Sequence, residues 1–318
     1  MKKKKLLIPL SILAGTTALA AGSVVVLGET FYNIALKNRK NRPSMSVLAK
    51  DKTTPLILQG DTRREWCDEV GAKDIAIKSF DGYWLHSYIA ENPGHTDKFA
   101  IICHGYTSRA KEMGFYAEKF YKKGFSCLLP SARCHDSSEG KFIDMGWLQR
   151  LDLLNWISYL NEEFGNPQIV LMGVSMGAAA VMMASGENLP PNVKCAIEDC
   201  GYSSIKEQFE HTLKNMVQIP KQPIMFSADL VTSCKTGIHL NRDGYCTEQL
   251  KKCKIPMLFI HGTNDRYVPF WMLDKNYEAH PGIKEKFVVT GGSHASNAWQ
   301  GGDAYWDKVM SFTEKFIK

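Results

Sequence analysis

The apolar positions of residues 71–318 follow two periodicities that alternate along the chain. Short runs rich in Val, Ile and Leu, bounded by Gly, Pro, Asn or Asp, predict buried strands. Longer stretches with apolar residues three and four positions apart predict helices. The predicted strands are residues 73–80, 83–90, 98–103, 125–130, 168–172, 194–199, 256–261 and 284–290. The predicted helices are residues 112–123, 147–164, 270–279 and 303–317, the second with Leu151, Leu154, Ile157, Leu160 and Phe164 on one face.

This alternation predicts an α/β fold in which an eight-stranded, mostly parallel sheet has helices on both faces. The dipeptide Asp81-Gly82 between the first two strands favours a tight hairpin, so we expect one antiparallel edge. Residues 203–254 interrupt the alternation between strands six and seven, and their length predicts a small helical lid. We therefore expect one domain over residues 71–318.

The N-terminal segment has a different character. Residues 6–28 are 23 positions without a charge, which is enough for a helix to cross a hydrocarbon layer of about 30 Å. Residues 1–28 are therefore predicted to be a membrane anchor or a signal peptide. The sequence Ala18-Leu19-Ala20 fits a cleavage site, and the protein would be secreted if it is cut after Ala20. The anchor is favoured because the apolar run continues past Ala20, and residues 29–70 are expected to be a polar, irregular tether.

The charge of the chain is concentrated at this end. Residues 1–42 carry eight Lys or Arg and one acid, so the formal net charge of +6 leaves −1 for the remaining residues. A body without basic excess argues against nucleic-acid binding. The four Lys at positions 2–5 directly precede the apolar segment, which favours a cytoplasmic N-terminus and a body outside the cytoplasm. The odd number of nine Cys argues the other way, because an oxidising exterior disfavours unpaired thiols.

One motif carries nucleophilic chemistry. The sequence Gly173-Val174-Ser175-Met176-Gly177 follows a predicted strand and precedes a run of small residues. A serine on a tight strand-to-helix turn projects its hydroxyl outward, and flanking glycines remove side chains that would clash there. The pattern predicts that Ser175 is a nucleophile.

A nucleophilic serine needs a base and a carboxylate that orients the base. Asp265 follows predicted strand seven and His294 follows predicted strand eight, at the carboxyl ends where open α/β sheets bind ligands. Asp199, at the end of strand six, is the alternative acid. Upstream, the sequence from His104 to Tyr106 follows strand three, where a backbone amide can join that of Met176 in binding an oxyanion.

Together these motifs resemble the α/β-hydrolase family from about residue 73 to the C-terminus. The stretch His-Gly-Thr-Asn-Asp-Arg-Tyr-Val-Pro at residues 261–269 is similar to the serine-aminopeptidase and monoacylglycerol-lipase-like branch. The resemblance implies Ser175 as nucleophile, His294 as base and Asp265 as its orienting acid. It also implies that the backbone N–H groups of Tyr106 and Met176 form the oxyanion hole. Residues 133–140 depart from the family's glycine-flanked loop, so the pocket wall is expected to differ.

The expected function is a serine hydrolase that cleaves a small-molecule acyl substrate through an acyl-enzyme, with an ester as the favoured class. A peptidase acting on short peptides and a non-catalytic, membrane-tethered binding module are the alternatives. No cofactor is expected. A zinc site is disfavoured, because the cysteines lack diagnostic spacing; the residues weighed for one are Cys234, His239, Cys246 and Cys253.

Overall fold

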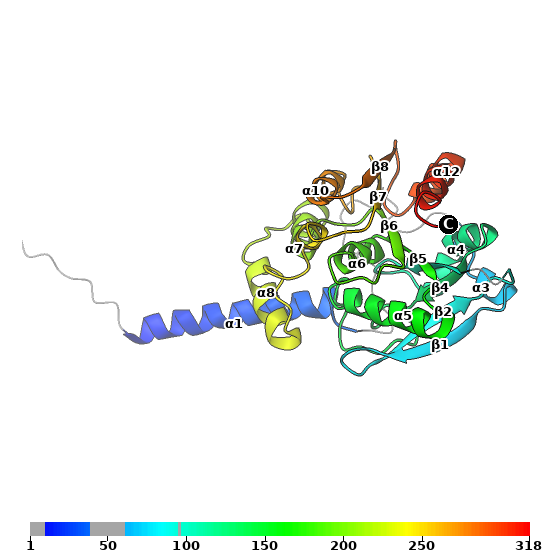
Figure 1. Ribbon diagram of the computed structural model, residues 1–318. Helices are drawn as coiled ribbons and strands as arrows, with labels where there is room; N and C mark the ends of the chain where they lie inside the picture. Colours follow the sequence, from blue (N-terminus) through cyan, green and yellow to red (C-terminus); the bar gives the residue numbers. More distant parts are fainter. Residues whose placement is uncertain (1–9, 39–60, 95–96) are drawn as a thin grey trace, which may run out of the picture.

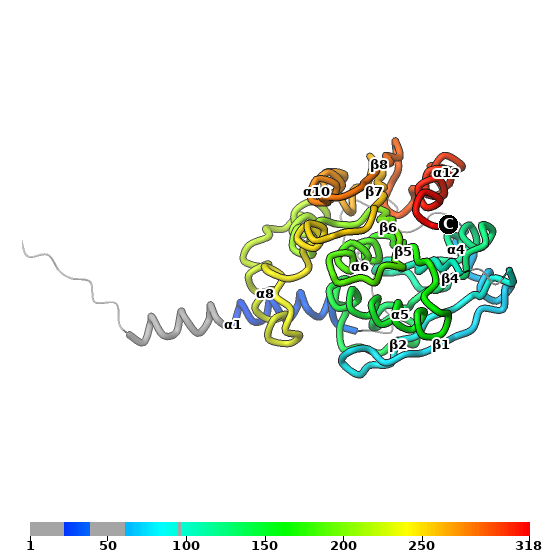
Figure 2. Tube along the Cα trace, viewed as in Figure 1, coloured from blue at the N-terminus to red at the C-terminus, as the bar shows by residue number. Residues whose placement is uncertain are grey.

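The computed structural model describes residues 10–38, 61–94 and 97–318, and for residues 10–21 it describes the backbone alone (Figure 2). Eight strands form one sheet in the order β1-β2-β4-β3-β5-β6-β7-β8 (Figure 1). The pairs β1–β2 and β2–β4 are antiparallel, and every other neighbouring pair is parallel. The strands are β1 (Lys73–Lys78), β2 (Trp84–Ala90), β3 (Lys98–Cys103), β4 (Ser126–Pro130), β5 (Gln168–Val174), β6 (Val193–Asp199), β7 (Met257–Gly262) and β8 (Lys284–Val289).

Helices cover both faces of this sheet (Figure 1). The helices of the described chain are α1 (Leu10–Ala35), α3 (Trp66–Glu69), η1 (Ala110–Met113), α4 (Gly114–Lys122), α5 (Gln149–Phe164), α6 (Met176–Ala184), α7 (Ile205–His211), η2 (Thr212–Val217), α8 (Ile224–Thr236), α9 (Cys246–Leu250), α10 (Trp271–Ala279), α11 (Asn297–Gln300) and α12 (Gly302–Thr313). One apolar core joins the sheet to α5, α6 and α10, and a second core joins its other face to α3, α4 and α12.

The predicted fold is confirmed. The central strands are apolar on both faces because helices bury both, and β3 has the predicted bounds. The elements α7, η2, α8 and α9 lie between β6 and β7, where the lid was expected. Figure 1 shows α7 and α8 at one end of the body, with α8 beside α1.

The N-terminal region differs from the prediction in one respect. The expected irregular tether begins at residue 29, but α1 continues to Ala35 and its last turns are buried, including Phe31 and Tyr32. Aromatic and apolar side chains in this stretch pack on the body, and this packing stabilises the additional turns of the helix. Near the other end of the expected tether, Trp66 and Cys67 are buried in α3. Residues 39–60 lie outside the described part of the chain.

Among the described residues no helix has both the length and the apolar composition for a membrane span. The predicted anchor, residues 1–28, is described only in part. Residues 1–9 lie outside the described part, and residues 10–21 are described as helical backbone only. The membrane anchor, the possible cleavage after Ala20 and the orientation of the body therefore stay predictions.

Candidate active site

Ser175 occupies a strained turn between β5 and α6. Its backbone has φ 56° and ψ −114°, outside the regions that side chains normally allow. The two glycines of the motif make this turn possible. A Cβ on Gly173 would lie 2.2 Å from the carbonyl oxygen of Gly177, and one on Gly177 would lie 2.2 Å from that of Cys103. The end of β5 therefore approaches the start of α6, and the start of α6 approaches β3, at distances that only glycine permits.

The structure brings the three side chains predicted for catalysis into one hydrogen-bonded chain. His294 Nε2 lies 2.9 Å from Ser175 Oγ, and His294 Nδ1 lies 2.7 Å from Asp265 Oδ2. Each residue follows the carboxyl end of a different parallel strand, β5, β7 or β8, so the sheet itself sets their spacing. All three residues are buried. An imidazole held between a hydroxyl and a carboxylate is arranged to accept the proton of the hydroxyl.

Asp265 is held as a carboxylate. Its Oδ1 accepts hydrogen bonds from the backbone N–H groups of Tyr267, at 2.9 Å, and Val268, at 2.8 Å. Burial alone would raise the pKa of this carboxyl group, but the neighbouring imidazoles of His294 and His261 outweigh it and hold the pKa well below its usual range. A permanent negative charge therefore faces His294 Nδ1.

The alternative acid, Asp199, is engaged elsewhere. Its Oδ1 accepts a hydrogen bond from Asn297 Nδ2 at 2.6 Å, and its Oδ2 accepts one from the Tyr305 hydroxyl at 2.7 Å. Burial raises the pKa of this carboxyl group despite these bonds. The geometry favours Asp265 over Asp199 as the partner of His294.

The loop after β3 lies against the nucleophile. A Cβ on Gly105 would lie 3.5 Å from Ser175 Cβ, so the backbone between His104 and Tyr106 passes directly over the serine. The His104 ring braces this loop, with Nδ1 2.8 Å from the Gly105 carbonyl oxygen and Nε2 accepting the Ala132 N–H at 3.0 Å. The predicted oxyanion donors, the N–H groups of Tyr106 and Met176, thus belong to the two segments that flank Ser175.

Comparison with known proteins agrees with the fold. The family model described as serine aminopeptidase, S33, matches residues 94–228. Esterase Pf2001 of Pyrococcus furiosus superposes with a TM-score of 0.64 at 20% identity, covering 84% of this chain and all of the esterase. The protein is an α/β hydrolase by fold.

Two relatives in sequence are described as uncharacterised proteins. An uncharacterised protein of Bacillus subtilis is 26% identical over 276 residues, 85% of this chain and 90% of its own length. An uncharacterised membrane protein of Saccharomyces cerevisiae is 25% identical over 248 residues, 75% of this chain and 78% of its own length. Both matches extend well beyond the segment that the family model covers.

Three residues of the candidate site were not assigned a role from the sequence. The Tyr267 ring packs on His294 with ring centroids 4.9 Å apart. His261 is buried, with Nε2 3.4 Å from Asp265 Oδ2. Cys200 lies beside Asp265 and His294, with possible ligand atoms of the three within 4.8 Å of one another. Two of these three groups, Asp265 and His294, already belong to the hydrogen-bonded chain that leads to Ser175.

The loop that departs from the family pattern, residues 133–140, is partly buried: Arg133, His135 and Ser138 are buried, whereas Asp136, Ser137 and Glu139 are exposed. His135 is 6% exposed, and its Nε2 lies 2.8 Å from the Tyr106 carbonyl oxygen. Arg133 forms a buried ion pair with Asp152 and a second pair with Asp81, each with closest atoms 2.7 Å apart. These ion pairs fix the loop, so the loop supports the backbone of the proposed oxyanion hole.

Proposed function

We propose that the protein is a serine hydrolase that cleaves carboxylic esters. The observation that carries the proposal is the hydrogen-bonded chain from Ser175 through His294 to Asp265, with Ser175 on a strained turn. In this proposal Ser175 Oγ attacks the acyl carbonyl while His294 Nε2 takes its proton. The N–H groups of Tyr106 and Met176 bind the oxyanion.

The second half of the reaction uses the same groups. His294 returns the proton to the departing alcohol, which leaves the acyl group on Ser175 as an ester. Water then attacks this acyl-enzyme with His294 again as base, and Ser175 is regenerated. Asp265 stays ionised throughout and keeps the imidazole in the orientation and tautomer that both halves need.

An ester is the favoured substrate because an alkoxide leaving group needs less protonation than an amine. The fold similarity to an esterase supports this choice. A peptidase acting on short peptides is the second candidate, since the matching family model is described as a serine aminopeptidase. A non-catalytic binding module is disfavoured, because such a protein has no need to keep a strained serine bonded to a histidine.

A fluorophosphonate probe tests the proposal directly. The full-length wild type is expected to be labelled, and Ser175→Ala to lose the label while it keeps the wild-type melting temperature. An unlabelled but folded wild type would contradict the serine-hydrolase proposal. Labelling that survives Ser175→Ala would contradict the assignment of the nucleophile. A panel of p-nitrophenyl esters and aminoacyl p-nitroanilides then separates esterase from peptidase activity.

We propose in addition that residues 1–28 anchor the protein in a membrane with its body outside the cytoplasm. The uncharged stretch of 23 residues and the four Lys before it support this proposal. The yeast relative, which is described as a membrane protein, is consistent with it.

A further inference from the structure

The C-terminal end of α1 is bonded to the active-site loop. The Tyr106 hydroxyl donates a hydrogen bond of 2.6 Å to the carbonyl oxygen of Ala35. Both residues are buried, and they are 71 positions apart in the sequence. The last carbonyls of a helix have no amide partner within the helix, so Ala35 is an acceptor that needs a donor from elsewhere. Tyr106 supplies this donor.

The chain after Ala35 is also held by the body. The Leu36 carbonyl accepts a hydrogen bond from the N–H of Ile143 at 2.7 Å, and Lys37 forms an antiparallel bridge with Phe142. Asn38 Nδ2 donates to the Gly140 carbonyl at 3.0 Å. These bonds hold the end of α1 against residues 140–143, at the end of the loop of residues 133–140.

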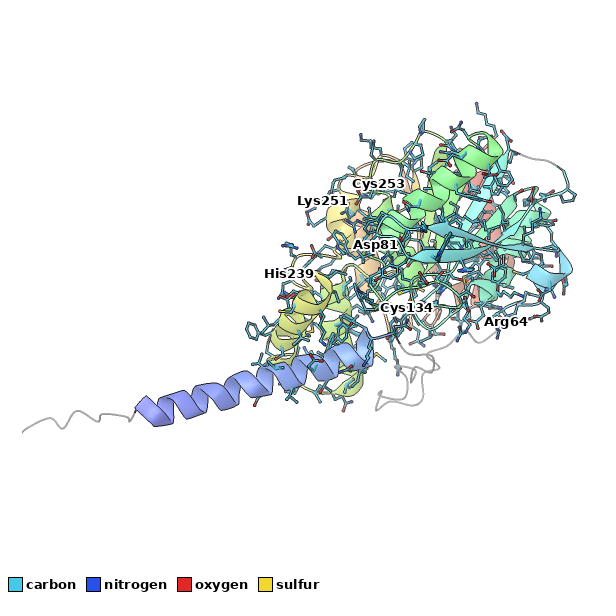
Figure 3. The ribbon with its side chains drawn as sticks, turned by 90° about the horizontal axis from the view of Figure 1, so that it is seen from below. Arg64, Asp81, Cys134, His239, Lys251 and Cys253 are labelled. Carbon is cyan, nitrogen blue, oxygen red and sulfur yellow. The ribbon has the colours of Figure 1, made fainter. Side chains whose placement is uncertain are left out.

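On its other side α1 packs against the lid. Gly28 approaches α8 so closely that a Cβ would lie 2.3 Å from the Ser227 carbonyl oxygen. Phe31 meets Phe209 of α7 edge to face, with ring centroids 4.9 Å apart. Figure 3 shows α1 running alongside α8 before it reaches the body. The end of α1 is therefore held between the lid and the active-site loop.

Tyr106 is consequently fixed at two points. Its hydroxyl is bonded to α1, and its carbonyl oxygen lies 2.8 Å from His135 Nε2. Its backbone N–H belongs to the segment that passes over Ser175. Hydrogen-bond donors stabilise an oxyanion efficiently only when they are held in place before the reaction begins.

We propose that the end of α1 is a positioning element of the active site, with the Ala35 carbonyl fixing Tyr106 as an oxyanion donor. This inference rests on the proposed serine-hydrolase function. The sequence predicts only an anchor and a tether in this region. The proposal gives the end of this helix a role in catalysis.

The test uses the full chain with Tyr106→Phe, which removes the bond to Ala35 and keeps the ring. The matched control is Tyr202→Phe, since the buried Tyr202 hydroxyl also donates a 2.6 Å bond to a carbonyl, but to that of Met145, which lies outside α1. For a soluble p-nitrophenyl ester we expect Tyr106→Phe to lower kcat about tenfold with KM unchanged, because only transition-state binding is weakened. The control is expected to stay within about twofold of the wild type.

A second variant loosens the helix from its far side. Phe31→Ala removes the contact with Phe209 and is expected to lower kcat in the same direction. The double variant with Tyr106→Phe is expected to show less than the product of the two effects, because both act through one contact. If melting curves show that Tyr106→Phe does not fold, Phe31→Ala carries the test alone.

The outcomes separate the two proposals. An unchanged kcat in Tyr106→Phe, or a loss no larger than that of Tyr202→Phe, overturns the role of α1. A change confined to KM also overturns it. A wild type that neither turns over esters nor reacts with the fluorophosphonate overturns the proposed function instead.

Discussion

Two buried carboxyl groups near the site are expected to ionise very differently. Asp265 accepts two backbone N–H bonds and faces two imidazoles, so it stays charged. Glu198 is fully buried, and of its two oxygens only Oε2 has a described donor, the N–H of Gly201 at 2.9 Å. Burial dominates and raises the pKa of Glu198 to about 8. Both carboxyl groups are buried, so it is the neighbouring imidazoles and hydrogen bonds of Asp265 that give the two residues different pKa values.

The first prediction concerns Asp265. Replacement by Asn keeps the size of the side chain but removes the charge and favours the wrong tautomer of His294. We expect kcat to fall by about 10⁴-fold, the scale known for such a change in serine hydrolysis. Steady-state kinetics with a p-nitrophenyl ester measures it. Asp199→Asn is the matched control, and a larger loss of kcat in that variant would mean that the orienting acid is misassigned.

The second prediction concerns Glu198 and pH. Its pKa is higher in the folded protein than in the unfolded chain, so between about pH 4.5 and 8 the folded state binds a proton that the unfolded state does not. This group therefore makes the free energy of unfolding fall as pH rises through that window. Glu198→Gln is expected to remove this dependence and to raise the melting temperature at pH 8 relative to the wild type.

Melting curves of both proteins at pH 5 and pH 8 measure the effect of Glu198. The difference between the two proteins isolates Glu198 from the other titrating groups nearby, His261 and Asp199. Equal pH slopes for the wild type and the variant would contradict the raised pKa.

At the scale of elements, the third prediction concerns the contact between α6 and β3. A Cβ on Gly177 would lie 2.2 Å from the Cys103 carbonyl oxygen and 2.8 Å from that of His104. Gly177→Ala therefore forces α6 away from the loop that covers Ser175. We expect a loss of more than about 3 kcal/mol in the free energy of unfolding, together with loss of fluorophosphonate labelling. Urea unfolding measures the first effect.

The control for Gly177 is Gly282→Ala. There the nearest atom to a new Cβ is a side-chain carbon of the His280 ring, at 3.1 Å, so the approach is much less close than at Gly177. This variant is expected to keep both stability and labelling. Equal behaviour of the two alanine variants would mean that close packing at Gly177 is not required.

The strands and the site were predictable because their signals are local. A buried strand is a short apolar run, and the order Ser175, Asp265, His294 places each side chain after such a run. The buried face of α5 was predicted less well. Leu153 and Trp156 are buried there, whereas Leu154 lies at the edge. The inward side of this helix also includes Asp152, which is buried in an ion pair with Arg133, and the apolar pattern alone does not indicate such a charged contact.

At the scale of the whole molecule, the region that the sequence described least well is the start of the chain. The apolar run ends at residue 28, and nothing local indicates that the helix continues and packs on the lid. That packing depends on Phe209 and α8, about 180 to 200 positions further along. Long-range contacts of this kind leave no periodic signal in the segment itself.

The fourth prediction concerns the orientation of the body in the membrane. Cys234 on α8 is the exposed cysteine of the set, and all nine cysteines lie in the described part of the chain. With the body outside the cytoplasm, a membrane-impermeant maleimide is expected to label intact cells through Cys234. Cys234→Ser is the control that should abolish this labelling.

Protease added to spheroplasts gives an independent measurement of the same orientation. The body is expected to be digested while the membrane is intact. A body that is protected, and a cysteine that is labelled only after lysis, would both place the body in the cytoplasm.

The continuity of α1 also sets how the body can move. A helix of 26 residues is a stiff rod of about 39 Å, and its last turns are fixed to the lid and to the loop at Tyr106. If the start of this helix lies in a bilayer, as proposed, no flexible linker separates the body from the membrane. The body then cannot swing away from the membrane surface. Ser175 then stays at a constant height above the lipid surface. Encounters with substrate become a two-dimensional search along that surface, which favours esters that partition into the membrane.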